Sequence, residues 1–591
     1  MLKSDLNLLG YTVFSTKALP EWKNAYYVPM RMPRTTHYSF FIAGEPGEEI
    51  CFTPVLFRIK ERNSRAVIWV FTDKIGAQIF RDNPNVDRVI VIPFEKWRKN
   101  IWEKAQEEMA NWIATYRQGV GWVCNFSGKP VCALLARLIG RNRAFGLLMD
   151  EDGSPVIVGN RWMQYAIEVI YPSLSDGLLC NENIMEKREI FCLALGLFCD
   201  KEDNGVFIKQ SSDVELYPFV KDPFVAICPS SDIETRRWPI EYWEKLIRLI
   251  RQHYQINVVV INFSSDTTDT IKGSSFNQKG VFVIDTREIS RIAFLLARAK
   301  MFVSVHNGLI YLSGSLDVPT MVICGPRNKG PGFDGIHLSV RRDVPCAPCN
   351  LLSCFRKYCL QQLTPEQVFD VFKFHWDAVA NGGFDEDLSS KIDFGSRGLC
   401  VEVFDRGLPN GMYRYLPLIN DYTDEVIARV SRMAYLYAWN RSNSMLLSED
   451  IPVDFSRYID WALDRDVKWT RFESAIKTQI RGLKEWEQKL SLLIIRLSEM
   501  LPPFPMSLFK RSPIDPENLW DSLENFDNTM PAILRKLSYE EWDSDMSYIE
   551  RVKYWIQVRK QLLILMREYR SFLESFVFSR KDRVEKEDSR K

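Results

Sequence analysis

Residues 304–326 read SVHNGLIYLSGSLDVPTMVICGP, and this stretch decides the fold class. A short apolar strand ends at His306-Asn307-Gly308, an apolar helix begins there, and a second strand, residues 319–324, closes on Gly325-Pro326. Strand, helix and strand in immediate succession indicate a parallel α/β sheet. In such sheets ligands bind beyond the carboxyl ends of the strands, and a helix start there directs N–H groups at an anion. The stretch therefore predicts part of an anion-binding site.

The same alternation extends in both directions along the chain. From about residue 38 to residue 216 the pattern predicts strands at 66–71, 86–93 and 120–128 with helices at 99–117 and 130–140. It restarts after residue 222, with strands at 224–231, 256–263, 281–286 and 301–305 and helices at 240–254, 289–299 and 365–379. We expect an α/β protein with two Rossmann-like domains, 1–216 and 217–380, facing across a cleft. One large doubly wound domain is the alternative.

The composition changes beyond residue 380. Residues 381–400 are rich in Gly, Ser and Asp and are typical of a linker. Residues 401–591 show helical periodicity, with apolar seams in which Ile476, Leu483, Leu490 and Leu497 recur every seven residues and a second seam runs through 549–573. We expect a helical extension in which two long helices form either an antiparallel hairpin or an interface of a homo-oligomer.

Charge and hydropathy limit the classes of partner. The formal net charge is +1, which does not indicate nucleic-acid binding. No stretch approaches 18 consecutive apolar residues, and the N-terminus lacks the apolar core of a signal peptide. We therefore expect a cytoplasmic protein without a transmembrane segment, whose 13 cysteines are thiols or metal ligands.

Two segments carry candidate chemistry. In 43–62, AGEPGEEICFTPVLFRIKER, Gly44 and Gly47 bracket a turn and a helix is expected to begin near Pro54. Glu48 in that turn is either a general base at the mouth of a cleft or part of a solvated cap. In 228–239, CPSSDIETRRWP, the hydroxyls of Ser230 and Ser231 and the guanidinium of Arg236 suit an oxygen-rich dianion, and an exposed basic turn is the alternative.

These pieces together resemble glycosyltransferase family 9, the heptosyltransferase-like enzymes of the GT-B fold. The early GD-x-x-x-x-x-P signature of the family resembles residues 47–54, its KxWP resembles 236–239, and its D-[ST]-G-x-x-H helix start resembles 306–311. The following P-x-x-x-x-G is similar to 319–325, the segment 133–147 is similar to the one before the family's domain midpoint, and a cysteine cluster precedes Pro365-Glu366-Gln367-Val368. The resemblance covers about residues 38–380.

The resemblance implies an inverting glycosyltransferase that moves a heptose or a similar sugar from a nucleotide-diphosphate donor. Glu48 would be the catalytic base, and no catalytic metal is expected because cations and amides hold the diphosphate. The residues implied for donor binding are Ser230, Ser231, Arg236, His306, Asn307, Gly308 and Leu309. The chain departs from the family pattern at four of the matched positions, where Glu48 and His306 replace Asp, Arg236 replaces Lys, and Tyr311 replaces His.

Four cysteines, Cys346, Cys349, Cys354 and Cys359, lie within 14 residues. This density suits a tetrahedral S4 site for structural Zn or Fe, and some heptosyltransferases that act on bacterial surface proteins are similar here. Reduced thiols that order a loop without metal are the alternative.

Three functions remain open on the sequence. A glycosyltransferase acting on a glycan, lipopolysaccharide or protein hydroxyl is favoured. The alternative is a catalytically degenerate GT-B scaffold that binds protein partners through the helical extension. A nucleotide-sugar epimerase of similar fold is disfavoured, because no histidine-carboxylate set occurs in the expected cleft segments. The sequence does not identify the base or sugar of the donor.

Overall fold

The structure is a computed structural model of the chain, and it separates the chain into two compact units. The first unit comprises residues 1–181 and 185–419, and the second comprises 182–184 and 420–591. The described residues are 25–29, 36–44, 46–99, 102–150, 153–174, 185–197, 206–208, 217–231, 233–263, 276, 278–325, 330, 333–346, 354, 358–384, 394–404, 415–418, 422–423, 425–431, 469–499, 564, 567, 570–571 and 573–574.

The first sheet has seven strands in the order β1-β7-β6-β5-β2-β3-β4. Its pairs are parallel except for the antiparallel pair of β6 and β7. The strands are β1 (Tyr26–Pro29), β2 (His37–Phe41), β3 (Val67–Thr72), β4 (Arg88–Val91), β5 (Trp122–Asn125), β6 (Ala144–Met149) and β7 (Pro155–Gly159). The helices are α2 (Pro46–Arg62), α3 (Lys74–Phe80), α4 (Phe94–Lys99), α5 (Trp102–Arg117), α6 (Pro130–Gly140), α7 (Arg161–Ile170) and α9 (Lys187–Ala194).

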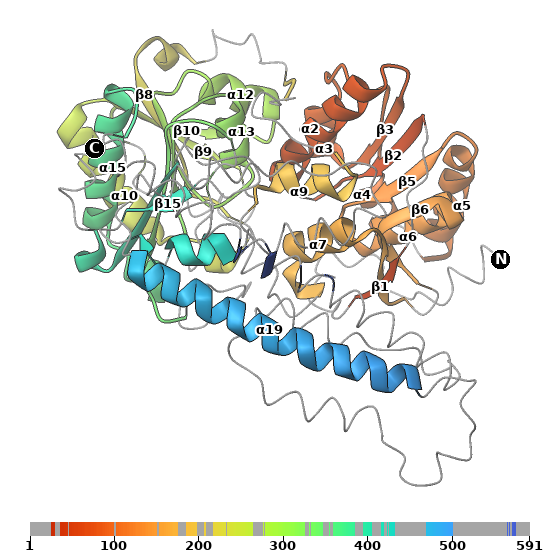
Figure 1. The fold of residues 1–591 in the computed structure, drawn as a ribbon. Helices are drawn as coiled ribbons and strands as arrows, with labels where there is room; N and C mark the ends of the chain where they lie inside the picture. The colour runs from red at the N-terminus through yellow and green to blue at the C-terminus, as the bar shows by residue number, and fades with distance from the viewer. Residues whose placement is uncertain are drawn as a thin grey trace. The chain divides into compact units, whose positions relative to one another are not determined.

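The second sheet has eight strands in the order β10-β9-β8-β11-β12-β13-β14-β15. In Figure 1 each of the two sheets has helices packed beside its strands. The strands are β8 (Phe224–Cys228), β9 (Asn257–Asn262), β10 (Val281–Asp285), β11 (Met301–Val305), β12 (Thr320–Ile323), β13 (His337–Arg342), β14 (Leu399–Phe404) and β15 (Tyr415–Pro417). The helices are α10 (Ile240–Tyr254), α12 (Ile289–Leu296), α13 (Leu309–Ser315), α14 (Tyr358–Gln361) and α15 (Pro365–Ala380).

Local sequence explains the helices that cover the second sheet. Trp243, Leu246 and Ile250 recur at helical spacing along α10 and are buried. Helix α15 begins with a capping box in which the Thr364 side chain accepts from the Gln367 N–H and the Gln367 side chain accepts from the Thr364 N–H. The predicted pair of α/β sheets is confirmed by these elements.

The end of the second sheet differs from the sequence expectation. The predicted linker reached residue 400 and the helical extension began at residue 401. Instead, β14 pairs antiparallel with β13, and β15 pairs antiparallel with β14. Residues 399–404 alternate apolar and polar side chains, LCVEVF, which is a strand pattern that the preceding Gly- and Ser-rich segment obscured. The first unit therefore continues to residue 419.

In the described part of the second unit the long helix is α19 (Trp469–Glu499). Its predicted seam residues Ile476 and Leu483 are buried, and so is Phe472. Lys484 pairs with Glu574 at 2.9 Å, and Glu487 pairs with Arg570 at 2.6 Å. The two ion pairs run in opposite directions along the chain: from residue 484 to 487 on α19, and from 574 to 570 in the facing segment. The antiparallel hairpin and the interface of a homo-oligomer both stay predictions. Most of the second predicted seam, residues 549–573, lies outside the described residues.

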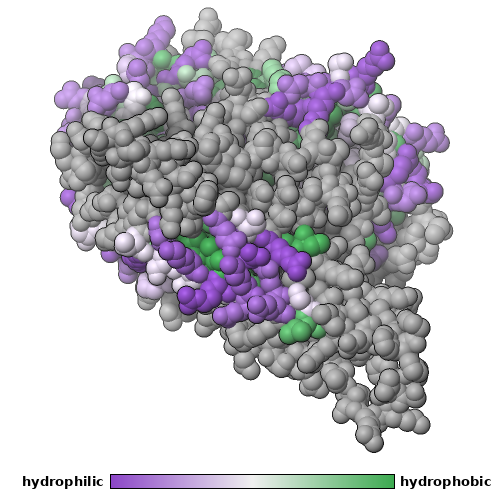
Figure 2. Space-filling model, viewed as in Figure 1, coloured by the Kyte–Doolittle hydropathy of each residue, from purple (hydrophilic) through white to green (hydrophobic). Residues whose placement is uncertain are grey.

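The surface of the described residues is mixed. On the face drawn in Figure 2, hydrophilic residues predominate and hydrophobic ones form small separate patches. Among the helices of the described residues, none combines the length and the apolar character needed to cross a bilayer. The cytoplasmic location stays a prediction.

Candidate functional site

The segment that carries Glu48 is the first turn of α2 and not the turn that the sequence predicted. The helix begins at Pro46, eight residues before the expected start near Pro54. A proline at the first position is already held in a helical φ, and two carboxylates in the first turn favour the positive helix start. Pro54 is accommodated inside the helix because Thr53 Oγ1 donates to the Ile50 carbonyl at 2.8 Å, the oxygen that the missing Pro54 N–H would have served.

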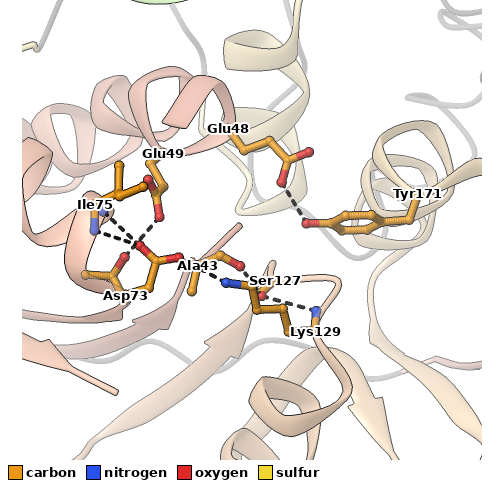
Figure 3. A network of polar contacts seen from close by, with 10 residues as sticks. Ala43, Glu48, Glu49, Asp73, Ile75, Ser127, Lys129 and Tyr171 are labelled. Carbon is orange, nitrogen blue, oxygen red and sulfur yellow. Dashed lines mark hydrogen bonds and ion pairs between the residues drawn. The ribbon is translucent and has the colours of Figure 1, made fainter. Parts of the chain in front are cut away.

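Glu48 is buried, with 7% of its surface exposed, and two side chains meet its carboxylate. The Tyr171 hydroxyl lies 2.9 Å from Oε2, as Figure 3 shows, and Lys187 Nζ lies 3.5 Å from Oε1. Tyr171 follows the end of α7, and Lys187 is the first residue of α9. Burial and the adjacent Glu48 charge raise the pKa of Tyr171 well above its usual value, so the phenol stays neutral and donates.

The start of α2 meets the His306-Asn307-Gly308 segment of the second sheet. A Cβ added to Gly47 would lie 2.4 Å from Tyr311 Cδ2, and one added to Gly308 would lie 2.9 Å from the Gly47 nitrogen. Only glycine permits this approach on both sides. The contact brings the predicted catalytic carboxylate beside the predicted donor segment, although the two are distant in sequence.

Two cations stand beside Tyr311. Lys187 Nζ lies 5.5 Å from the centroid of the Tyr311 ring. Burial raises the pKa of Tyr311, and the positive charges of Lys187 and Arg236 oppose that rise. The half-buried Arg236, in the 3-10 turn 234–236, thus acts on the same region as Lys187. The site can hold negative charge next to Glu48.

The other predicted donor residues are buried and hydrogen-bonded among themselves. Asn307 Nδ2 lies 3.0 Å from the Ser230 carbonyl and 3.3 Å from Cys228 Sγ, and Asn307 Oδ1 accepts from the Leu309 N–H at 2.9 Å. Ser230 Oγ lies 3.3 Å from Cys228 Sγ. The Leu309 N–H, which sequence reasoning assigned to the diphosphate, therefore has a partner within the protein.

The remaining predicted positions lie near the same segment. Ser231 Oγ accepts from the Ile233 N–H at 3.3 Å, and Ser231 is buried. His306 is also buried, and its Nε2 lies 3.4 Å from the Tyr311 hydroxyl. The two side chains that depart from the family pattern at 306 and 311 thus contact each other.

A second carboxylate lies directly behind Glu48. Glu49 accepts a hydrogen bond from Thr72 Oγ1 at 3.1 Å, and Asp73 next to it caps α3 and pairs with Lys129 at 3.0 Å (Figure 3). Burial is the main cause that raises the pKa of Glu49 well above the usual value, and the Asp73 charge adds to it. This network holds the ends of β3 and β5 beneath the first turn of α2.

Sequence reasoning missed three residues of the site. Tyr171 and Lys187 are separated from Glu48 by 123 and 139 residues, and no local pattern marks them. Tyr415 of β15 is fully buried, and a Cβ on Gly330 would lie 1.8 Å from its Cζ. Burial, with the Glu186 charge and Tyr311 as further causes, raises the pKa of Tyr415 well above its usual value. Residues beyond the predicted donor domain therefore reach the same neighbourhood.

The predicted metal ligands are described only in part. Cys346 is exposed, Cys354 and Cys359 are partly buried, and Cys349 lies outside the described residues. Burial raises the pKa of Cys359, and the thiols of Cys346 and Cys354 are near enough to raise it further. No group of three or more His, Cys, Asp or Glu side chains arranged to hold a metal ion occurs in the described part of the chain. The metal site therefore stays a prediction.

Comparisons with known proteins found a matching family model, similar sequences and similar structures. Residues 186–359 match the model of glycosyltransferase family 9 (heptosyltransferase). Lipopolysaccharide heptosyltransferase 1 of Pseudomonas aeruginosa is 26% identical over 51% of this chain and 82% of that protein. A family 9 glycosyltransferase structure from Veillonella parvula has a TM-score of 0.42 and 16% identity, covering 59% of this chain and 99% of the other. The iron-containing dodecameric glycosyltransferase TibC from enterotoxigenic Escherichia coli has a TM-score of 0.34 and 12% identity, covering 60% and 77%.

Proposed function

Since the chain belongs to glycosyltransferase family 9 and is a glycosyltransferase, we propose that it moves a heptose or a similar sugar from a nucleotide-diphosphate donor to an acceptor hydroxyl with inversion. The observation that carries this proposal is the close approach of Gly47 to Gly308 and Tyr311, which sets Glu48 beside the donor segment.

In the proposed reaction Glu48 acts as the general base. Its carboxylate takes the proton of the acceptor hydroxyl while the hydroxyl oxygen attacks the anomeric carbon from the side opposite the leaving group. The new C–O bond forms as the old one breaks, and the nucleoside diphosphate leaves with that electron pair. No metal is needed for the proton balance.

The charge that develops on the diphosphate is met by cations and dipoles already in place. We assign Arg236 to the phosphates, with the hydroxyls of Ser230 and Ser231, the His306 ring and the main-chain amides of Asn307 and Gly308 around them. The Leu309 N–H stays with Asn307 Oδ1 in this proposal.

For the acceptor we propose a hydroxyl of lipopolysaccharide, because the P. aeruginosa relative is named a lipopolysaccharide heptosyltransferase. A protein acceptor remains the second candidate, favoured by the additional helical unit beyond residue 419. The competing function is a degenerate scaffold that binds donor weakly or not at all and binds protein partners through that unit.

A donor panel tests the proposal. Purified protein is incubated with ADP-, GDP- and UDP-linked heptoses and hexoses, and thermal shift and release of the nucleoside diphosphate are measured. We expect stabilisation and slow donor hydrolysis with one heptose nucleotide, and Arg236→Ala to raise the donor concentration needed for half-maximal effect about tenfold to a hundredfold. Arg248→Ala, on the exposed face of α10, is the control. If no donor stabilises the protein and none is hydrolysed, the result favours the degenerate scaffold.

We further propose that Cys346, Cys349, Cys354 and Cys359 bind one structural Zn or Fe. Elemental analysis is expected to find about one metal per chain in the wild type. The Cys346→Ser/Cys359→Ser protein should lose it, and a buried cysteine substitution remote from the segment, Cys192→Ala, should not. Equal metal content in all three proteins contradicts the assignment. A homo-oligomer formed through the helical unit stays a prediction, which light scattering tests.

A further inference from the structure

The Glu48 carboxylate is held by more contacts than a general base in a cleft requires. Each carboxylate oxygen has its own partner, Tyr171 at Oε2 and Lys187 at Oε1. Gly44 makes room for this arrangement, because a Cβ there would lie 3.2 Å from Glu48 Oε2. A carboxylate held at both oxygens has little rotational freedom.

Tyr171 is itself held in place from two sides. A Cβ on Gly128 would lie 2.5 Å from Tyr171 Cε1, so the ring is seated directly on that glycine. The hydroxyl also lies 2.7 Å from the Phe126 carbonyl oxygen. The phenol has one hydrogen and two acceptors within reach, so its donation depends on which acceptor is the stronger.

That choice follows the charge on Glu48. An ionised carboxylate is the stronger acceptor and takes the phenol hydrogen, since charge-assisted hydrogen bonds exceed neutral ones. When Glu48 receives the acceptor proton, its oxygens become weaker acceptors and the hydrogen can turn to the Phe126 carbonyl. Neither state leaves the phenol hydrogen unsatisfied inside the protein.

Lys187 connects the two sheets at the same place. Its ammonium lies 3.5 Å from Glu48 Oε1 on α2 and 5.5 Å from the centroid of the Tyr311 ring on α13. Tyr311 stands where the family pattern has histidine, so here a ring offers its face to a lysine. Lys187 can therefore hold Glu48 in register with the donor side of the site.

We propose that Tyr171 and Lys187 are positioning residues of the transfer reaction, which hold the two oxygens of the Glu48 carboxylate, and that Tyr171 changes its hydrogen-bond acceptor when Glu48 takes up the proton. The inference rests on the proposed function, because it assigns a role in the same reaction.

The test compares Tyr171→Phe and Lys187→Met with matched controls in kcat, KM and the pH profile. Tyr171→Phe removes one hydroxyl from a buried ring, and Tyr165→Phe, on α7 and equally buried, controls for that loss. Lys187→Met is controlled by Lys74→Met on the exposed surface, and Lys187→Arg tests rescue of the charge. We expect Tyr171→Phe to lower kcat about tenfold to a hundredfold with donor KM within about twofold.

The pH profile separates positioning from a merely structural role. Loss of the Tyr171 hydrogen bond or of the Lys187 charge disfavours the ionised carboxylate, so the acidic limb of kcat/KM should move about 1 pH unit upward. The titratable groups that interact in this region and remain unchanged in these variants include Cys51 on α2, Glu186 and Arg188 at the start of α9, Tyr311 and Arg236.

The outcomes are distinguishable. Wild-type protein without turnover on any donor overturns the proposed function and this inference with it. Wild-type turnover with unchanged kcat and pH profile in both Tyr171→Phe and Lys187→Met overturns the inference alone. If Tyr171→Phe does not fold, the test rests on the partly exposed Lys187. In that case kcat and the pH profile of Lys187→Met are compared with those of Lys187→Arg, which keeps the positive charge.

Discussion

Glu48 and Asn307 face the same site from the two sheets, yet their polar groups are used differently. The Glu48 carboxylate contacts two ionisable side chains, the Tyr171 hydroxyl and the Lys187 ammonium. Asn307 bonds the Ser230 carbonyl, Ser304 Oγ and the Leu309 N–H, which belong to the ends of the neighbouring strands and the start of α13. We infer that the Glu48 side chain is arranged to take part in the reaction, whereas the Asn307 side chain fixes the conformation of the surrounding main chain.

The partners of a buried polar side chain at a sheet edge therefore indicate whether its role is structural or chemical. A side chain whose partners are groups at the ends of neighbouring strands and at a helix start stabilises that framework when it is satisfied. A carboxylate whose partners are a phenol and an ammonium keeps an acceptor for a substrate proton. Substitutions should therefore divide into those that affect turnover and those that affect stability.

Glu48→Gln tests the catalytic half of the comparison and carries the largest expected effect. Glutamine keeps the shape and accepts the Tyr171 hydrogen bond but cannot take a proton, so kcat should fall about 10³-fold. The melting temperature and donor binding should remain near wild type. Steady-state turnover and thermal unfolding measure both, with Glu61→Gln at the far end of α2 as the control. Turnover within about threefold of wild type would remove Glu48 from the reaction.

Asn307→Ala tests the structural half. The substitution removes the Asn307 partner of the Ser230 carbonyl and of the Leu309 N–H, and each such loss costs about 1–3 kcal/mol. Ser304 Oγ loses one donor but keeps main-chain carbonyls to which it donates. We expect the free energy of unfolding of the first unit to fall by about 4 kcal/mol, measured by urea titration. Asn111→Ala, exposed on α5, should change it little. A variant of normal stability that fails to bind donor would mean that Asn307 contacts the ligand itself.

The sequence predicted the sheets and the facing segments, but not the contacts that complete the site. Strand and helix periodicity located β3, β5, β9, β11 and α10, because apolar spacing is a local property. Glu48 and Arg236 were found through motifs at fixed spacing. Tyr171, Lys187 and Tyr415 reach the site only after folding, from chain positions whose neighbours carry no pattern. The start of α2 was misplaced because Pro54 reads as a helix start, although Thr53 lets the helix pass through it.

The two sheets also differ in the sign of their pH dependence. His375 of α15 is fully buried, with Nε2 2.9 Å from the Ile336 carbonyl, and burial lowers its pKa to about 4. Below about pH 6.5 this histidine is protonated in the unfolded chain, whereas in the folded protein it stays neutral until about pH 4. The free energy of unfolding should therefore fall by about 3 kcal/mol as the pH is lowered from about 6.5 to 4.

His375→Gln sharpens that contrast. Glutamine can still donate to the Ile336 carbonyl but does not titrate, so the variant should lose less stability between pH 7 and pH 4 than the wild type. Urea unfolding at several pH values measures the slope, and His253→Gln, exposed on α10, should keep the wild-type slope. Equal slopes in all three proteins would contradict a neutral buried His375.

Glu49 should make the free energy of unfolding change with pH in the opposite direction to His375, and this is the smallest of the predicted effects. Its pKa in the folded protein is raised, chiefly by burial, so the folded state holds this proton more tightly than the unfolded chain. Stability should therefore decline as pH rises above the ordinary glutamate range. Glu49→Gln accepts the Thr72 hydrogen bond without carrying charge, so the variant should exceed the wild type by about 1 kcal/mol at pH 8, and the gap should narrow toward pH 5. The same Glu61→Gln control shows no such trend if the effect belongs to the buried position. A gap that widens toward acid would mean that Glu49 is ionised in the folded protein and stabilised by Lys129, which would make the polar network behind Glu48 a charged one.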